Sequence, residues 1–384
     1  MIRLWALLAD VVPLYPLYAL LFADTGLSDA EISALFAIWS VVGIVVEVPT
    51  GALADRFSRK SALVAGGVLQ AAGYALWTAT PGFAAFAAGF VLWGLGGSLV
   101  SGSVEALLYD GLAATGAQEH FTRIYGQVGA FELIAQIPAA VAATVLFPLG
   151  GYELVGWASV ATCLMAAFVA SRIPEPPRTE SGEDDGEDNG EEEGSYLATL
   201  RTGVMEAVRS PAVRGAVVAV ALLTSLDGIE EYFPLLARDW HVPVDAIPLA
   251  VVAIPLAGAA GSALAGRLDR LRPFSLALVL LAGVALFGLA GLLGVPAGLV
   301  LVGLFYAVYR AVLVVANARL QERIDGTARA TVTSVAGLGT DLAGLLLYAA
   351  WAAAGLPAAL VLALVVAAVL PIGLRRRSAA GTRT

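Results

Sequence analysis

Charged side chains inside long apolar segments are the residues of this sequence that could carry chemistry. Charge placed within a lipid bilayer is costly, so such residues by default mark a pathway or a paired site. The deepest ones are four acids and one base: Asp10, Glu132, Asp227, Asp341 and Arg310. Because the acids outnumber the base, the set suits the binding of protons or of a cation.

Asp10 and Glu132 are the predicted proton carriers. Asp10 lies in "LLADVVPLYPLY", where Pro13 and Pro16 loosen the backbone. Glu132 is about eleven residues into its segment, hence about 16 Å deep at the helical rise, with Gln136 on the same face. A deep carboxyl group with no base in its own helix can take up and release a proton near neutral pH. The alternative for each acid is a hydrogen bond to a neighbouring helix.

Arg310 does not shed its charge, so the sequence predicts a carboxylate partner for it. Asp227 lies at a similar depth and is the candidate, and Asp341 is near that depth as well. The pair could be a structural ion pair or a clamp for a substrate. Tyr306 and Tyr309 flank Arg310 and could line a cavity, although aromatic side chains in such segments are usually part of the core.

The composition places these residues in a membrane protein. Of the 384 residues, 59% are hydrophobic and 14% are charged, whereas a soluble domain carries about a quarter charged residues. A helix needs about 20 mostly apolar residues to cross a bilayer. Twelve segments qualify: 3–23, 30–53, 61–79, 82–110, 121–148, 151–171, 212–236, 246–266, 273–293, 296–320, 329–352 and 356–374. The expected fold class is an all-α membrane protein with twelve transmembrane helices in two six-helix bundles.

One polar segment divides the twelve spans into six and six. It reads "IPEPPRTESGEDDGEDNGEEEGSY" and holds ten acids and one base, so the net charge of −9 belongs to this segment. Its composition predicts a disordered linker, and residues 197–210 predict an amphipathic helix at the membrane surface. The expected domains are an N-terminal bundle over 1–172, a cytoplasmic linker over 173–210 and a C-terminal bundle over 211–384.

Basic residues predict the orientation of the spans. Nearly all of the Lys and Arg residues fall on one side of the twelve segments, whereas Arg238 is assigned to the other side. Basic loops stay in the cytoplasm. We therefore expect a multi-pass protein of the plasma membrane with both termini and the linker in the cytoplasm.

A short stretch repeats between the two halves. "LADRFSR" at 53–59, between the second and third spans, corresponds to "LAGRLDR" at 264–270, between the eighth and ninth spans. Two parallel six-helix repeats are typical of a transporter whose substrate site lies at the repeat interface.

The stretch "GALADRFSRK" at 51–60 resembles the loop signature of the major facilitator superfamily, with Ser58 where that family usually has glycine. The stretches "EVPTG" (47–51), "SGSVEALLYD" (101–110) and "RATVTS" (329–334) are also similar to one branch of the family. The residues to which we assign a gating role in these motifs are Glu47, Gly51, Asp55, Arg56, Arg59, Lys60, Glu105 and Asp110.

The resemblance implies alternating access, in which two six-helix bundles rock about a central site. The signature loop would then form a cytoplasmic latch: Asp55 would face the amino end of a helix in the other half, and Arg59 could pair with Asp110. Alternatively, these charges only anchor a loop and set the topology. For Glu47 and Glu105 we favour a structural or gating role, coupled to the latch, over direct contact with a substrate.

We expect a proton-coupled secondary transporter that exports small, partly hydrophobic compounds. The alternatives are a proton-linked importer of a small polar solute, and a transporter-like receptor or scaffold without flux. The fourth span has no arginine, and the fifth lacks the Gly-Pro-rich motif that drug–proton antiporters of the family often carry. The expected partners are a small-molecule substrate, protons as the coupling ion and the lipid bilayer, and the protein is expected to be a monomer.

Other function classes find no support in the sequence. One cysteine and two distant histidines predict no metal site. There is no Gly-x4-Gly-Lys-Ser/Thr loop and no catalytic triad, so we expect no direct ATP drive, no enzymatic activity and no cofactor. The acidic balance and the lack of a basic stripe argue against binding of nucleic acid.

Overall fold

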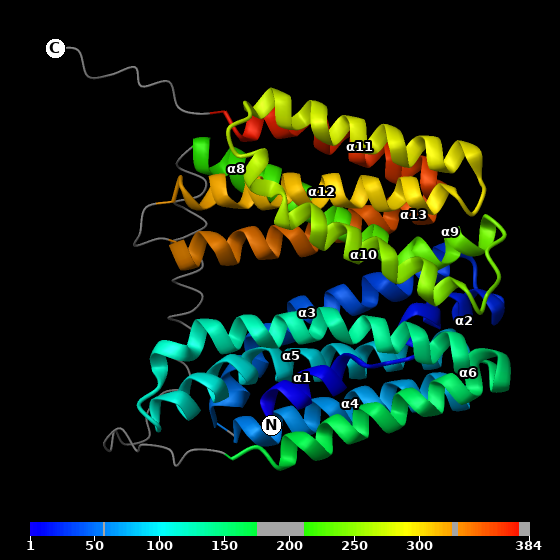
Figure 1. Cartoon of the computed structure of the whole chain (residues 1–384), viewed down its shortest axis with the longest axis vertical. Coiled ribbons are helices and arrows are strands. Elements are labelled where there is room, and N and C mark those ends of the chain that lie inside the picture. Colours follow the sequence, from blue (N-terminus) through cyan, green and yellow to red (C-terminus); the bar gives the residue numbers. More distant parts are fainter. Residues whose placement is uncertain (57, 175–210, 325–328, 376–384) are drawn as a thin grey trace. The chain divides into compact units, whose positions relative to one another are not determined.

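The computed structural model describes residues 1–56, 58–174, 211–324 and 329–375. Side chains are described for these residues except at 47–56, 102, 211–212 and 329–334. The predicted linker, residues 173–210, therefore lies outside the described residues apart from its first two positions. The described chain folds into helices joined by short turns, without strands in the described ranges, as expected for an all-α protein (Figure 1).

The first half of the chain forms six helical segments that follow the predicted spans. The first span is broken into α1, η1 and α2, and the sixth follows the fifth within α6. The elements are α1 (Ile2–Asp10), η1 (Tyr15–Leu17), α2 (Tyr18–Asp24), α3 (Asp29–Arg56), α4 (Arg59–Ala79), α5 (Phe83–Ala113), η2 (Gln118–His120) and α6 (Phe121–Ser171).

The second half repeats this plan, again with a broken first segment and a merged last pair. The elements are α8 (Pro211–Thr224), η3 (Ser225–Tyr232), α9 (Phe233–Asp239), α10 (Ile247–Ala263), η4 (Ala265–Arg267), α11 (Pro273–Leu293), α12 (Gly298–Gln321) and α13 (Arg329–Gly373).

The two longest helices each contain a sharp break between two spans. Within α6 the backbone leaves helical geometry at Gly150 and at Gly151, which has a φ of 57°. Within α13 it does so at Ala354 and at Gly355, which has a φ of 58°. Positive φ is costly for residues with a Cβ atom, so glycine makes these reversals possible. By length and hydropathy, eight segments among the described residues can cross a membrane, and the candidates that contain α6 and α13 hold two predicted spans each.

The first span is broken where the sequence predicts it. Between α1 and η1, the backbone N–H of Leu14 donates to the Ser159 Oγ at 2.9 Å, instead of to a carbonyl of its own helix. Pro13 and Pro16 have no N–H to donate, so the break leaves fewer backbone donors to satisfy. Asp10 is the last residue of α1, directly before this break.

The described residues cluster into two compact units, which we treat separately. Unit 1 comprises the described residues up to 174 together with Glu231–Val252, and unit 2 comprises residues 211–230 together with the described residues from Ala253 to 375. The boundary falls within η3, so α9 and the start of α10 group with the first half. The expected division at 172 and 211 remains a prediction about domains.

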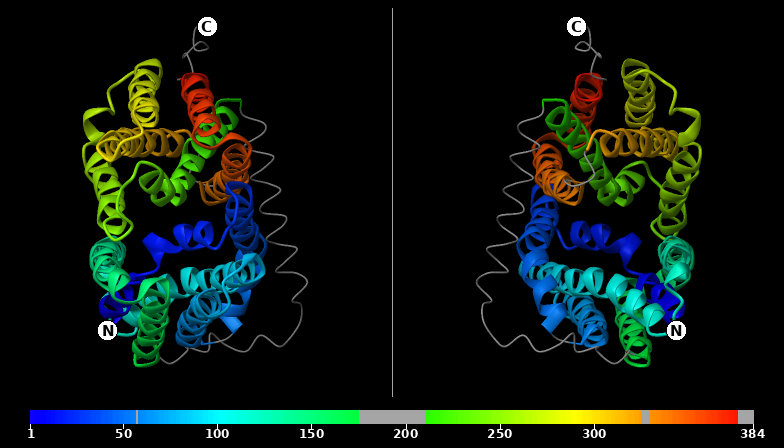
Figure 2. Two further views of the ribbon diagram at one scale, coloured as in Figure 1. Left: turned by 90° about the vertical axis from the view of Figure 1, so that its right-hand side faces the viewer. Right: turned by 90° about the vertical axis from the view of Figure 1, so that its left-hand side faces the viewer.

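Small residues let the helices within each unit approach closely. In unit 1, α4 packs against both α5 and α6, and a Cβ atom at Gly66 would lie 2.8 Å from the carbonyl oxygen of Gly96 on α5. In unit 2, α8 packs against α13, and α11 packs against α12 and α13 (Figures 1 and 2). A Cβ atom at Gly261 of α10 would lie 2.0 Å from the Ala307 carbonyl oxygen of α12. Close approach at small residues is the usual way that membrane helices associate.

Candidate functional site

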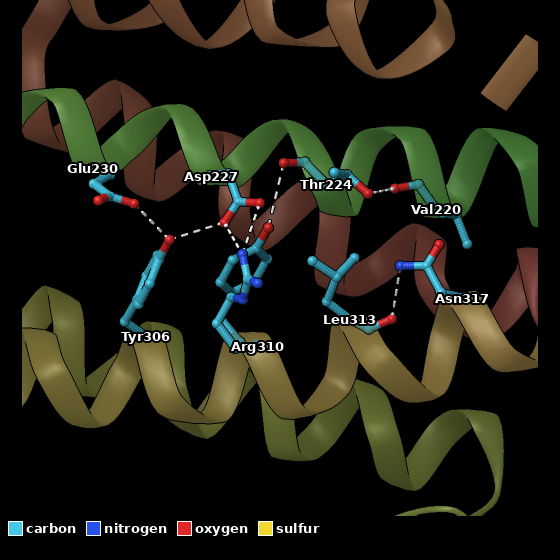
Figure 3. Close-up of polar contacts among 9 residues, drawn as sticks. Val220, Thr224, Asp227, Glu230, Tyr306, Arg310, Leu313 and Asn317 are labelled. Carbon is cyan, nitrogen blue, oxygen red and sulfur yellow. Dashed lines mark hydrogen bonds and ion pairs between the residues drawn. The ribbon is translucent and has the colours of Figure 1, made fainter. Parts of the chain in front are cut away.

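An ion pair between Asp227 and Arg310 forms the centre of the polar cluster in unit 2. The Arg310 Nη1 lies 3.1 Å from both Asp227 carboxylate oxygens, and Figure 3 shows the pair between η3 and α12. Both side chains are partly exposed, at 38% for Arg310 and 35% for Asp227. The predicted carboxylate partner of Arg310 is therefore present, and it is Asp227.

Tyr306 connects this pair to a second acid that the site prediction left out. Its hydroxyl lies 3.0 Å from the Asp227 Oδ1 and 2.9 Å from the Glu230 Oε2 (Figure 3). A phenol has a single hydrogen, so it can donate to only one carboxylate at a time. Both contacts can be hydrogen bonds at once only when one of the two carboxyl groups carries a proton. Arg310 already binds Asp227, so Glu230 is the acid of the two that has no ion-pair partner among the described residues.

The helix α12 positions these side chains through its spacing. Tyr306, Tyr309 and Arg310 are three and four residues apart, so they share one face of the helix. Tyr309 is fully buried, and its hydroxyl donates to the Thr224 carbonyl at 3.3 Å, at the end of α8 where the helix changes to η3. On the neighbouring α10, a Cβ atom at Gly258 would lie 2.6 Å from the Tyr306 ring and 3.0 Å from the Arg310 Cγ. Tyr309 thus supports the helix break, and Gly258 makes room for the cluster.

The predicted proton carriers of unit 1 lie near each other. Asp10 at the end of α1 and Glu132 on α6 are both exposed side chains, and the charge of Glu132 acts on Asp10. Neither forms an ion pair with a basic side chain among the described residues. The charge of Asp10 also reaches Tyr74 and Cys163. Unit 1 therefore brings two acids together without a compensating base.

Another acid of unit 1, Glu231, is bound by a tyrosine of an aromatic cluster. The hydroxyl of Tyr18 donates to the Glu231 carboxylate, and the Tyr18 ring lies 5.8 Å from the Trp77 ring and 6.0 Å from the Phe90 ring, measured between centroids. The next residue, Tyr232, shares a 2.8 Å hydrogen bond with the Ser33 Oγ. Glu231 thus has a fixed partner and belongs to the packing of unit 1.

Asp341, which the sequence placed at the depth of Asp227, is half-buried on α13 in unit 2. It is not among the residues joined by the contacts in Figure 3. Its role in coupling or binding stays a prediction.

The signature stretch contains a contact that was expected from the sequence. The guanidinium of Arg59 donates to the Asp110 carboxylate on α5 and, at 3.2 Å, to the Ala106 carbonyl. Ser58 is the N-cap of α4, and its Oγ accepts a hydrogen bond from the Ser61 N–H at 3.1 Å. A serine cap offers a helix start that glycine supports less well, which gives this departure from the signature a structural reason.

Other residues of the signature are described in part. Glu47, Gly51, Asp55 and Arg56 belong to α3, but their side chains lie outside the described residues, so the latch contact of Asp55 stays a prediction. Lys60 is half-buried in the first turn of α4, and Glu105 is an exposed side chain on α5.

The corresponding loop of unit 2 is held by an arginine that the site prediction omitted. Arg319, near the end of α12, is only 9% exposed. It donates to the carbonyls of Asp269 at 2.8 Å and Leu271 at 2.6 Å, in the loop that leads from η4 to α11. A buried arginine is stable only with such acceptors, so Arg319 fixes this loop much as Arg59 fixes the start of α4.

Comparison with known families agrees with the helical plan and the signature stretch. Residues 5–348 match the Major Facilitator Superfamily. The chain belongs to the major facilitator superfamily. It is accordingly a multi-pass membrane protein of that family.

Two curated proteins are similar in sequence to part of this chain. It is 32% identical over 162 residues to an uncharacterised MFS-type transporter of Mycobacterium tuberculosis (strain CDC 1551 / Oshkosh). The corresponding protein of strain ATCC 25618 / H37Rv matches to the same extent. The matched part covers 42% of this chain and 38% of either relative, which is well under half of their length.

Solved structures of the superfamily share the fold over almost the whole chain. A D-xylose-proton symporter has a TM-score of 0.71 at 13% identity and covers 96% of each chain. A nucleoside transporter has a TM-score of 0.69 at 13% identity over 97% of this chain and 96% of its own. A bacterial homolog of the human lysosomal transporter Spinster, in an inward-facing and occupied conformation, has a TM-score of 0.72 at 14% identity, covering 97% and 90%. At such identities these structures show the fold alone.

Glu230, which the site prediction omitted, and its predicted neighbour Tyr306 both have signals in the sequence. Glu230 follows Asp227 by three residues and so lies on one helical face with it. Tyr306 precedes Arg310 by four, so the sequence predicts two polar faces that could meet. Arg319 has no such signal, because its partners are backbone carbonyls 48 and 50 residues away.

Proposed function

We propose that the protein is a proton-coupled secondary transporter that works by alternating access and exports small, partly hydrophobic compounds. The observation that carries the coupling is the arrangement of Asp10 and Glu132, two exposed acids of which Glu132 is close enough for its charge to act on Asp10. Two nearby carboxylates repel when both are ionised, so binding of one proton is favoured and its release is readily triggered. A pair with a bound arginine could not do this, because the base keeps its acid ionised.

Unit 2 contributes a second acid that can carry a proton. The Tyr306 hydroxyl lies between the carboxylates of Asp227 and Glu230, and it satisfies both only when Glu230 is protonated. Loss of that proton would leave Tyr306 with two ionised acceptors and one hydrogen. The protonation of Glu230 would therefore change the hydrogen bonding around Arg310, which makes this cluster a suitable place for substrate contact.

The gating part of the proposal rests on the signature stretch. Arg59 already binds Asp110, which ties the start of α4 to the end of α5. We assign to Asp55 the latch contact with a helix of the other half, and to Glu47 and Glu105 a role in gating. The distribution of basic residues supports cytoplasmic termini in a plasma-membrane protein, and we propose that a monomer is the working unit.

Flux measurements in proteoliposomes test this function. Purified protein would be reconstituted, a pH gradient imposed in either direction, and a panel of lipophilic and polar compounds followed as they move. We expect accumulation of a partly hydrophobic compound against its gradient, driven by protons moving the opposite way, and no accumulation without the gradient. Accumulation of a polar solute together with protons would instead assign import. A panel in which no compound moves would favour a receptor or scaffold.

A matched pair of variants links the flux to the acids of unit 1. Glu132→Gln removes the candidate proton site, and Glu153→Gln changes another exposed acid of α6 beyond the Gly150–Gly151 break. Loss of gradient-driven accumulation in the first variant alone supports the proposal. Equal loss in both variants, or in neither, contradicts it.

A further inference from the structure

A cavity of about 490 Å³ lies beside the Arg59–Asp110 contact in unit 1, and the proposed transport function does not use it as a binding site. It opens beside the last turns of α5 and the start of α6. The residues that line it are Arg59, Glu105, Ala106, Tyr109, Asp110 and Phe121. Its volume lies in the range of small-molecule sites, about 300–1,000 Å³.

The cavity has one negative charge that no basic side chain among the described residues balances. Arg59 donates to the Asp110 carboxylate and to the Ala106 carbonyl, so these two charges offset each other along one wall. The carboxylate of Glu105 is exposed and has no hydrogen bond or ion pair among the described residues. A site with one uncompensated carboxylate attracts a cation and disfavours an anion.

Aromatic rings form the apolar side of the same cavity. The Tyr109 ring lies 5.6 Å from the Phe121 ring in an edge-on arrangement, and the Phe121 ring is stacked on Tyr125 at 5.5 Å. Tyr109 is 50% exposed, so its ring is open to a ligand. Tyr125 also feels the charge of Glu105. Aromatic faces attract organic cations within about 6 Å of the ring centre.

We propose that this cavity binds a protonated amine. Its ammonium group would bind Glu105, and its carbon atoms would pack against Tyr109 and Phe121. A divalent metal ion is a poorer occupant, because hard cations need about six oxygen ligands and one of the two acids is already bound by Arg59. The ammonium group can belong to a free amine or to the ethanolamine head group of a lipid, which present the same chemistry.

Binding measurements on the full chain in lipid nanodiscs test the proposal. The discs would contain phosphatidylcholine and phosphatidylglycerol, and the probes would be free ethanolamine or added phosphatidylethanolamine. Native mass spectrometry reports bound lipid, and hydrogen exchange of the segment 103–125 reports occupation by either probe. We expect Glu105→Gln to weaken binding of the occupying probe by about fivefold, as loss of one charged contact implies.

Two further variants make the result specific. Glu322→Gln removes another exposed acid at a helix end and should leave binding of both probes unchanged. Tyr109→Leu keeps an apolar side chain but removes the ring, and we expect binding about threefold weaker. If Glu105→Gln does not fold, as judged by its melting temperature, Tyr109→Leu decides the question.

The outcomes separate the two sources of the amine. Weaker binding of phosphatidylethanolamine alone assigns the cavity to a lipid head group, and weaker binding of free ethanolamine assigns it to a soluble amine. Wild-type protein that binds neither probe overturns the proposal. Binding that is unchanged in both Glu105→Gln and Tyr109→Leu, or that is weakened equally by Glu322→Gln, overturns it as well. Transport assays are not involved, so the result is independent of the proposed function.

Discussion

Unit 1 and unit 2 treat the acids of their membrane-length helices in opposite ways. In unit 1, Asp10 and Glu132 are exposed acids near each other, without an ion-pair partner among the described bases. In unit 2, Asp227 lies 3.1 Å from the Arg310 guanidinium. An arginine partner offsets the charge of a carboxylate, and an acid without such a partner lacks this compensation. Among the described residues, the two units therefore differ in whether a predicted acid has an arginine partner.

The two loops that carry the repeated stretch show a second contrast between the halves. In unit 1 an arginine at the start of α4 reaches across to an acid at the end of α5. In unit 2 an arginine near the end of α12 reaches back to carbonyls of the loop before α11. The direction of the contact is reversed although the loop sequences repeat. Both repeats therefore have an arginine contact at this loop, but different residues form it in each unit.

The largest expected effect comes from breaking the ion pair of unit 2. Asp227→Asn leaves the Arg310 charge without its carboxylate in a partly buried site, which we expect to cost about 1–3 kcal/mol of stability. Transport activity should decrease together with the stability. Thermal unfolding of the purified variant measures the first effect, and the double variant Asp227→Asn/Arg310→Gln should recover part of the stability. A single variant as stable and active as wild type would show that the pair is dispensable.

The next effect concerns the acids of unit 1. Glu132→Gln should abolish accumulation driven by a pH gradient and leave downhill exchange of substrate, because the amide cannot carry the coupling proton. The measurement is substrate counterflow compared with gradient-driven flux in the same proteoliposomes. If the variant accumulates substrate at the wild-type rate with unchanged pH dependence, the proton site moves to Asp10.

A smaller effect tests the protonation inferred for Glu230. Glu230→Gln imitates a protonated acid and can keep a hydrogen bond to Tyr306, so its thermal midpoint should stay near that of wild type. Tyr306→Phe removes both hydrogen bonds and should cost about 1 kcal/mol. Thermal unfolding of the two variants in parallel measures the difference. A loss of stability in Glu230→Gln as large as in Tyr306→Phe would mean that Glu230 is ionised.

The latch contact of unit 1 is expected to have a modest effect. Asp55→Asn should slow transport without abolishing substrate binding, because loss of a charge at a helix end shifts the balance of states by about 0.3–1 kcal/mol. Turnover and equilibrium binding measured on one preparation separate the two quantities. Glu119→Gln, a neutral change at an exposed acid of η2 outside the signature stretch, serves as the control for surface charge. Turnover equal to that of wild type would remove the latch role of Asp55.

The smallest expected effect concerns the segment that joins the halves. Residues 175–193, which lie outside the described residues, are too polar to pack, and we expect them only to tether the two bundles. A neutral, flexible replacement of equal length should leave folding and transport near the wild-type level. Flux and monodispersity of the replacement protein check this. A marked loss of either would assign the acidic segment a further role.

Much of the fold could be predicted because each membrane helix is recognised from a run of consecutive apolar residues. The ninth span was expected at 273–293, and α11 has those bounds. Pro13 and Pro16 indicated the break in the first span, since proline removes a donor wherever it lies. The break at η3 had no comparable signal, because it depends on contacts such as the hydrogen bond from Tyr309 to the Thr224 carbonyl.

The sequence by itself determined that the chain is an all-helical membrane protein of this family and that Arg310 needs an acid. Both follow from rules that apply residue by residue: the length of an apolar helix, and the cost of an unpaired charge in lipid. Only the tertiary structure decided that Tyr306 joins Asp227 to Glu230, that Arg319 holds a loop, and that Glu105 faces an aromatic cavity. These contacts join residues far apart in the chain, and their geometry is set by how the helices pack within each unit.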